Sequence, residues 1–203
     1  IVNFSVTASD NCGIASAVSS YPSGFKFPVG TTTVYDTAID IHGNTSTCSF
    51  TVTVNDTTKP TLVCPANITV SNDSGICGAV INFSITASDN CGIASAVSSY
   101  PSGFTFPVGT TTVYDTAIDI HGNTSTCSFT VTVNDTTKPT VICKNITTNL
   151  DSTGNLVVSP SQIDNSSFDN CSIKTYILTP NKFNCSNIGA NSVTLTVIDS
   201  SGN

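Results

Sequence analysis

Apolar and polar residues alternate along much of this chain, which is the pattern of strands with one buried and one exposed face. In residues 2–8 and 50–54 the apolar positions are Val2, Phe4, Val6 and Ala8, and then Phe50, Val52 and Val54. Such segments recur about every 8–12 residues, between clusters of Gly, Asn, Asp and Ser that favour turns. The pattern predicts an all-β protein made of β-sandwich domains.

The composition supports strands over helices. The chain contains no Glu, Arg, Met or Trp, and its single Gln is Gln162, so most strong helix formers are missing. No apolar run approaches the ~18 residues of a membrane-spanning helix, so we expect no direct membrane insertion. A net charge of −7 argues against nucleic-acid binding, which needs clustered basic residues. It suits a solvated extracellular surface or a divalent cation.

A tandem repeat organises the sequence. Three cysteines at positions 12, 48 and 64 recur with the same spacing at positions 91, 127 and 143, and residues 1–64 differ from residues 80–143 at only six positions. Near-identical copies argue against a specialised catalytic copy, because an enzyme needs one site. We therefore expect no enzyme activity.

The repeat predicts three domains, at residues 1–58, 59–137 and 138–203. The third has diverged but keeps Asp169-Asn170-Cys171 and a turn at residues 199–203. By this register the first domain lacks its N-terminal strand and the third its last strand, so we expect a segment of a longer polypeptide. Short Lys-Pro linkers precede the second and third domains, and proline stiffens them.

One strand pattern carries a carboxylate on its apolar face. Asp36 shares that face with Val34 and Ala38, whereas the third domain has only apolar residues at the matching positions. A β-bulge could turn Asp36 outward.

The second repeat carries a long motif. It contains Cys64-Pro65, Ala87-x-Asp89-Asn90-Cys91, Pro101-Ser102-Gly103, Ala117-x-Asp119-x-x-Gly122-Asn123 and Cys127-x-Phe129-Thr130-Val131. This motif resembles the hyalin repeat (HYR) domain. The resemblance implies tandem immunoglobulin-like sandwiches with a role in adhesion or extracellular scaffolding. Long arrays of such cysteine-containing repeats are similar to the giant surface adhesins of gliding bacteria.

The nine cysteines of this Ser- and Thr-rich chain suggest an oxidising compartment. In a sandwich of the topology that the resemblance implies, Cys12–Cys48 and Cys91–Cys127 meet at one pole. The expected remaining pairs are Cys64–Cys77 and Cys143–Cys185, which would leave Cys171 for a cysteine beyond Asn203. Free buried thiols are the alternative. Zinc is less favoured, because no Cys-x-x-Cys occurs.

Aspartates stand where consecutive domains should meet. The predicted trio at the first junction is Asp56, Asp89 and Asp119, and the equivalent trio at the second is Asp135, Asp169 and Asp199. Carboxylate oxygens suit a hard cation such as Ca²⁺. The alternative is that these side chains cap turns by bonding nearby backbone amides.

Threonines in Asp-Thr-Ala and Asp-Thr-Thr triplets are candidate O-glycosylation sites if the source is a gliding bacterium. These residues are Thr37, Thr57, Thr116 and Thr136. A glycan on Thr37 would accompany an outward Asp36. Asn-x-Ser/Thr triplets, such as those at Asn44 and Asn67, would be glycosylated only in a eukaryotic secretory pathway.

The leading functional hypothesis is a stiff extracellular stalk or filament segment of a large cell-surface adhesin, which projects a distal binding region for adhesion or surface motility. Its partners would be neighbouring repeats, and possible further partners are surface polysaccharide or other adhesin filaments. Ca²⁺ is the one candidate cofactor. In the alternative, each repeat binds polysaccharide or a receptor through an exposed aromatic cluster, for which Tyr21, Phe25 and Phe27 are the only candidates. Of these, Phe27 is expected in the core. A filament subunit that self-associates laterally is a further possibility.

Overall fold

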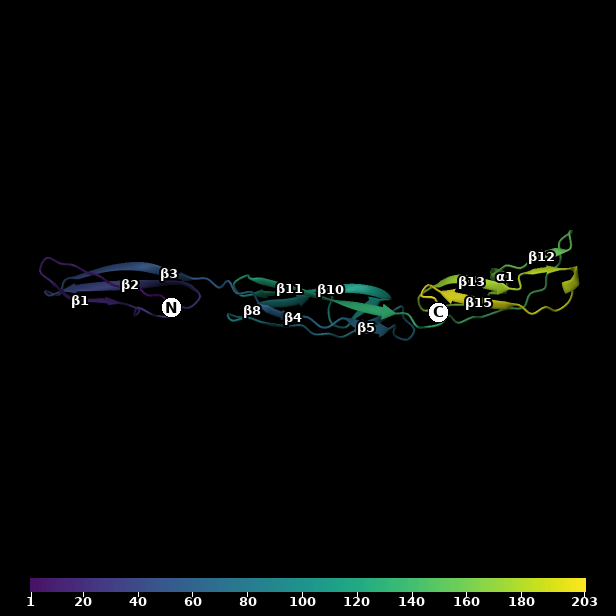
Figure 1. Cartoon of the computed structure of the whole chain (residues 1–203), viewed down its shortest axis with the longest axis horizontal. Helices are drawn as coiled ribbons and strands as arrows, with labels where there is room; N and C mark the ends of the chain where they lie inside the picture. The colour runs from purple at the N-terminus through teal and green to yellow at the C-terminus, as the bar shows by residue number, and fades with distance from the viewer.

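A computed structural model describes all of residues 1–203 as three β-rich units in single file (Figure 1). We call residues 1–58 unit 1, residues 59–137 unit 2 and residues 138–203 unit 3. Helical structure is confined to the one-turn α1 (Pro160–Ile163) and the 3₁₀ turn η1 (Cys185–Asn187). Neither is long and apolar enough to cross a membrane. The protein is all-β, as the alternating pattern predicts.

Unit 2 shows the sandwich in full. Its larger sheet has the strand order β5-β11-β10-β8, in which β5 is parallel to β11 and the other neighbours are antiparallel. Two strand pairs, β4–β7 and β6–β9, complete the unit. The eight strands are β4 (Thr61–Val63), β5 (Ile68–Ser71), β6 (Gly78–Ile81), β7 (Thr86–Ser88), β8 (Ile93–Ser98), β9 (Phe104–Pro107), β10 (Gly109–Asp119) and β11 (Thr124–Asn134).

The core of unit 2 lies between the larger sheet and the β6–β9 pair. Its buried residues are Ala79, Ile81, Phe106, Val113, Phe129, Val131 and Val133. They come from β6, β9, β10 and β11 at every second position, so the period-two pattern places the apolar face of each strand in one core. Phe106 is fully buried and packs against Tyr100 and Phe104.

Unit 1 repeats the central part of this arrangement as one sheet, with β2 (Gly30–Asp40) between β1 (Ile14–Ser19) and β3 (Thr45–Val54). Residues 50–54 lie in β3, as predicted. Within residues 2–8 the burial alternates over most of the segment, but only Val2 pairs, with Phe25. The equivalent residues of unit 2 include β7, which pairs with β4, and no equivalent of β4 stands beside residues 2–8.

Unit 3 is more irregular. It contains two antiparallel pairs, β13 (Ile173–Thr179) with β15 (Thr194–Asp199), and β12 (Asn155–Val157) with β14 (Lys182–Asn184). Its core holds Val158, Ile163, Leu178, Leu195 and Val197. Short loops at its N-terminal end face unit 2 (Figure 1).

The proposed outward turn of Asp36 is wrong. Asp36 is 7% exposed and its counterpart Asp115 is fully buried. The β10–β11 register runs unbroken from Gly109 to Ile118, so no bulge in that ladder rotates the carboxylate outward. A buried charge needs hydrogen bonds to offset lost hydration, and the Ser98 hydroxyl donates one to Asp115. Cys64 Sγ also lies 2.9 Å from Asp115 Oδ2, but this sulfur is in a disulfide and has no proton to donate.

Candidate functional site at the domain junctions

Three segments meet wherever one unit follows another. At the first junction they are the linker residue Asp56, the Asp89-Asn90-Cys91 loop that follows β7, and the Asp119–Asn123 turn between β10 and β11. The two loops belong to unit 2 and lie at its N-terminal pole. The linker therefore delivers one carboxylate of unit 1 to a pole where unit 2 presents two more.

The aspartates of unit 2 shape their own loops. Asp89 Oδ1 accepts a hydrogen bond of 2.8 Å from the Cys91 amide. Asp119 Oδ1 accepts from the amides of His121 and Asn123 at 2.8 and 2.9 Å, and its Oδ2 accepts from Asn123 Nδ2 at 2.7 Å. Asp40 and Asp199 make the same bonds in units 1 and 3. The turn-capping interpretation is therefore correct for these residues.

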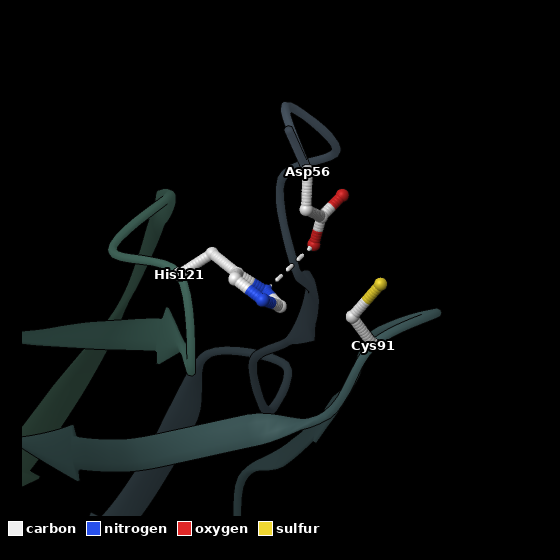
Figure 2. A group of neighbouring side chains, drawn as sticks. All are labelled: Asp56, Cys91 and His121. Atoms are coloured by element: carbon white, nitrogen blue, oxygen red, sulfur yellow. Dashed lines mark ion pairs between the residues drawn. The ribbon is translucent and has the colours of Figure 1, made fainter. Parts of the chain in front are cut away.

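Contacts across the first junction converge on Asp56, and Figure 2 shows the one that His121 makes. Asn123 Nδ2 donates to the Asp56 carbonyl oxygen at 3.2 Å, which gives the turn asparagine a partner in the preceding unit. His121 Nδ1 lies 3.3 Å from Asp56 Oδ2. Asn90 Nδ2 lies 3.5 Å from Asp56 Oδ1, at the limit for a hydrogen bond. Unit 2 thus holds the end of unit 1 through both backbone and side chain.

The predicted trio at this junction comes together. Carboxylate oxygens of Asp56, Asp89 and Asp119 lie within 4.8 Å of one another. The Thr58 amide donates to Asp56 and lowers the pKa of that carboxyl. For Asp119, burial raises the pKa, but donors from Asn123, His121 and Gly122 outweigh it and the net shift is downward. Asp56 and Asp119 are therefore ionised at neutral pH.

Cys91 lies against the same cluster (Figure 2). Burial, followed by the hydrogen bond to Asp56 and the nearby carboxylates, raises the pKa of the Cys91 thiol. The side chains of Asp56, Cys91 and His121 form a second group with potential metal ligands within 4.8 Å of one another. A raised pKa keeps the sulfur protonated at neutral pH, and a protonated thiol is a poor metal ligand.

The predicted trio at the second junction comes together only in part. Asp135 and Asp169 cluster with the sulfur of Cys171, while Asp199 does not belong to that group. Asn203 Nδ2 donates to the Asp135 carbonyl oxygen at 3.1 Å, as Asn123 does to Asp56. Ser201 takes the place of His121, and its hydroxyl donates to Asp135 Oδ2 at 3.1 Å.

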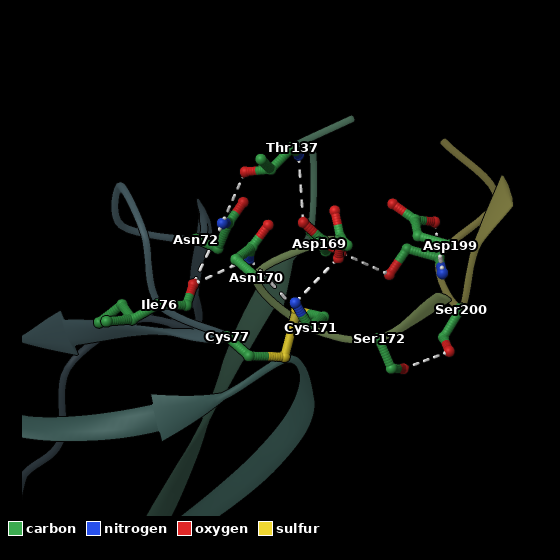
Figure 3. The surroundings of a disulfide bond; sticks show 12 residues. Asn72, Ile76, Cys77, Thr137, Asp169, Asn170, Cys171, Ser172, Asp199 and Ser200 are labelled. Carbon is green, nitrogen blue, oxygen red and sulfur yellow. Dashed lines mark hydrogen bonds between the residues drawn. A yellow bond between two sulfur atoms is a disulfide. The ribbon is translucent and has the colours of Figure 1, made fainter. Parts of the chain in front are cut away.

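A disulfide between Cys77 and Cys171 crosses the second junction (Figure 3). It joins the loop before β6 in unit 2 to the Asp169-Asn170-Cys171 loop of unit 3, and Asn170 Nδ2 beside it donates to the Ile76 carbonyl oxygen at 3.0 Å. This pairing corrects two expectations, namely Cys64–Cys77 and a partner for Cys171 beyond Asn203. Both had assumed that bridges stay within one domain.

The second disulfide, Cys64–Cys127, lies within unit 2 and overturns the expected Cys91–Cys127 pair. Cys127 lies inside β11, not at its start, and is directly opposite Asp115 in β10. Since Asp115 faces the interior, Cys127 does too, and there it meets Cys64 just after β4. Cys91 stays at the pole, out of reach.

The two remaining expected bridges are also wrong. Cys12 and Cys48 are both unpaired and exposed. Cys48 lies opposite Asp36 in the ladder, in the position that Cys127 has in unit 2, whereas Cys12 lies in the loop before β1. In unit 3, the backbone of Cys143 forms an isolated β-bridge with Asp164, whereas Cys185 begins η1 next to Gly154. The expected disulfide between Cys143 and Cys185 does not form, and both thiols are free.

The candidate glycosylation threonines fall into two classes. Thr57 and Thr136 lie exposed in the linkers, whereas Thr37 and Thr116 lie half-buried in β2 and β10. The linker threonines are the more accessible to a glycosylating enzyme. Because Asp36 is buried, an outward carboxylate no longer supports a glycan on Thr37.

Comparisons with known proteins agree with this picture. The HYR domain model matches residues 2–54 and 55–133. Hyalin of Strongylocentrotus purpuratus is 46% identical over 146 residues, and hyalin of Lytechinus variegatus is 39% identical over 145. Both alignments cover 68% of this chain, but only 12% and 27% of the relatives.

A third relative is the "Sushi, von Willebrand factor type A, EGF and pentraxin domain-containing protein 1" of Rattus norvegicus. It is 32% identical over 135 residues, which are 63% of this chain and 4% of the relative. Among solved structures, four extracellular cadherin domains of protocadherin gamma B7 align over 84% of this chain and 49% of theirs, with 20% identity and a TM-score of 0.32. The family model matches well over half of the residues, and the chain belongs to the HYR domain family.

Proposed function

We propose that this chain is a stiff spacer in the stalk of an extracellular adhesion protein. The observation that carries the proposal is that each unit is bonded to the preceding unit by an equivalent contact. Asn123 and Asn203 bind the backbone of the preceding unit at two successive junctions, and a disulfide adds a covalent link at the second. Units held in this way transmit force and keep their direction, as a stalk requires.

The surrounding features favour an oxidising, extracellular location. Disulfides persist outside the cytosol, and this chain has one within a unit and one between units. Adhesion or scaffolding is also the role that membership of the HYR family suggests. In the complete protein, the stalk would project a distal binding region for adhesion or surface motility, with neighbouring repeats as its direct partners.

Small-angle X-ray scattering of the full chain tests the proposal. The longest strands of units 1 and 2 have 11 residues, as in β2 and β10, so one such unit is about 36 Å long at ~3.3 Å per residue. Three units in line give a rod of about 110 Å, with a radius of gyration of about 32 Å. A globular chain of this length would have a radius of about 17 Å. A measured radius close to the globular value, or a broad distribution of bent shapes, would overturn the stiff-spacer proposal.

A second candidate function is direct binding of polysaccharide or a receptor by each repeat. The suggested aromatic residues are poor candidates, because Tyr21, Phe25 and Phe27 pack against one another and Phe27 is buried. Tyr35 and Tyr114 favour it instead, since they recur in consecutive units and are 60% and 65% exposed. Binding on a glycan array that is lost in the Tyr35→Ala/Tyr114→Ala double variant would support this function.

A further inference from the structure

Two carboxylate oxygens at the first junction are buried and accept no hydrogen bond, namely Asp89 Oδ2 and Asp56 Oδ2. Asp89 Oδ2 has no ion-pair contact, and Asp56 Oδ2 has only the one with His121 Nδ1 at 3.3 Å. The Asp56 side chain is only 3% exposed, so water does not solvate this oxygen freely. A buried charged oxygen without a partner is costly, which points to a positively charged ligand at this position.

The oxygens are also close enough to bind a single ion. Calcium binds oxygens at about 2.4 Å, so two ligands of the same ion lie at most about 4.8 Å apart. Oxygens of Asp56, Asp89 and Asp119 meet that condition, since they lie within 4.8 Å of one another. They come from three separate segments on both sides of the junction, so a shared ion would join unit 1 to unit 2.

The balance of charges at the first junction also favours a bound cation. Three carboxylates gather here, and the His121 imidazole beside Asp56 can supply at most one positive charge. With the imidazole charged, a net charge of about −2 remains, which one divalent cation would neutralise. Carboxylates are hard ligands and favour Ca²⁺ over the softer metals that prefer thiolate and imidazole.

We propose that Asp56, Asp89 and Asp119 form a Ca²⁺ site that fixes unit 2 on unit 1. The inference deepens the proposed function, because a cation shared by two units stiffens their junction. The remaining ligands of the ion would be backbone oxygens or water, as is usual for calcium. At the second junction Asp169 Oδ2 is likewise buried without a donor, but Asp199 lies outside the cluster and the third potential ligand there is the disulfide-bonded sulfur of Cys171. The second junction therefore does not have the same set of three carboxylates.

Calorimetric titration of the chelator-treated full chain with CaCl₂ tests the site. We expect one bound Ca²⁺ per chain, with a rise in the melting temperature of the chain. Asp56→Asn and Asp89→Asn should each weaken binding by about tenfold or more, because calcium affinity depends on the number of ligand charges. Asparagine keeps the Oδ1 acceptor that both loops use, for the Thr58 amide and the Cys91 amide respectively, so these variants should fold.

Matched controls separate the site from general charge effects. Asp10→Asn changes the residue equivalent to Asp89 in unit 1, and Asp10 makes the same bond to the Cys12 amide without a preceding unit in this chain. Asp135→Asn changes the residue equivalent to Asp56 at the second junction. Both controls should retain Ca²⁺ binding. Absence of Ca²⁺ binding, or equal loss in the controls and the site variants, would overturn the proposal.

A parallel titration with ZnCl₂ covers the competing set of Asp56, Cys91 and His121. Zinc binding that is lost in Cys91→Ser, in a chain that does not bind Ca²⁺, would also overturn the calcium assignment. Scattering with and without Ca²⁺ distinguishes the two proposals. If the chain is extended and Ca²⁺ does not change its shape, the spacer proposal stands and the proposal that Ca²⁺ stiffens the junction fails. If the chain is compact with and without Ca²⁺, the spacer proposal fails.

Discussion

The two junctions of this chain share one hydrogen bond to the backbone and differ in the contacts beside it. In both, the asparagine that ends an Asp-x-x-Gly-Asn turn donates to the carbonyl oxygen of the last aspartate of the preceding unit, at 3.2 Å for Asn123 and 3.1 Å for Asn203. The first junction adds a cluster of three carboxylates with His121, and the second adds the Cys77–Cys171 disulfide. The asparagine contact is common to both junctions, and the additional contacts beside it differ.

The equivalent cysteines of the two junctions differ in whether they form a disulfide within residues 1–203. Cys91 and Cys171 occupy the same position in the Asp-Asn-Cys loop, yet only Cys171 is bridged. In the register of the repeat, the position in unit 1 that matches Cys77 falls before Ile1, outside this chain. Among residues 1–203, Cys91 therefore has no cysteine at the position that pairs with Cys171.

The largest expected effect comes from removing the bridge across the second junction. The Cys77→Ala/Cys171→Ala variant loses a link that closes a loop of 94 residues, and the chain-entropy model gives such a link up to about 4–5 kcal/mol. We expect unit 3 to unfold at a lower denaturant concentration. Fluorescence of its Tyr176 is not specific enough, so amide hydrogen exchange of β13 and β15 should follow the change.

Cys91→Ala is the matched control, because Cys91 is at the equivalent position but is not bridged. It should leave the stability of unit 2 within about 1 kcal/mol of the parent, since only a half-buried thiol is lost. Equal effects of the bridge variant and the control would contradict the assignment of a covalent clamp to the second junction alone.

A smaller effect is expected from the asparagine contact. Asn123→Ala removes a bond to Asp119 within the turn and a bond to the Asp56 carbonyl across the junction. Asn44→Ala removes only the bond within the turn, because Asn44 bonds Asp40 and has no preceding unit in this chain. The difference between their unfolding free energies should be about 0.5–1.5 kcal/mol, the net value of one hydrogen bond. Thermal or urea unfolding of both variants gives that difference, and a value near zero would show that the contact is not a clamp.

Repetition and turn chemistry are local signals, so the sequence predicts which loops lie at the junctions. The Asp-Asn-Cys loop and the Asp-x-x-Gly-Asn turn each end a strand pattern, and the immunoglobulin-like topology that the HYR resemblance implies places both at one pole. The trio of Asp56, Asp89 and Asp119 was found in this way. At the second junction the same logic placed Asp199 in a cluster that it does not join, since diverged loops alter the spacing of the carboxylates.

Disulfide pairing could not be predicted in the same way, because it depends on register and on contacts between units. Cys127 was expected at a pole, but its register opposite Asp115 turns it into the core toward Cys64. Cys77 was assigned a partner inside its own unit, although its loop faces unit 3. One sequence signal was available: Cys77 follows a turn cluster at the C-terminal pole of unit 2, and Cys171 opens the N-terminal pole of unit 3.

The smallest expected effect comes from exchanging the residue that differs between the two turns. His121→Ser gives the first junction the residue that bonds Asp135 at the second, where Ser201 Oγ donates at 3.1 Å. A partly exposed ion pair contributes about 0–1 kcal/mol, so replacing it by a hydroxyl hydrogen bond should change the unfolding free energy of unit 2 by about 0.5 kcal/mol or less. Urea unfolding in chelator measures this value, with His42→Ser in unit 1 as the control. A loss several times larger than this would show that the imidazole is the principal counter-charge of Asp56, and the carboxylate cluster would then have less need of a cation.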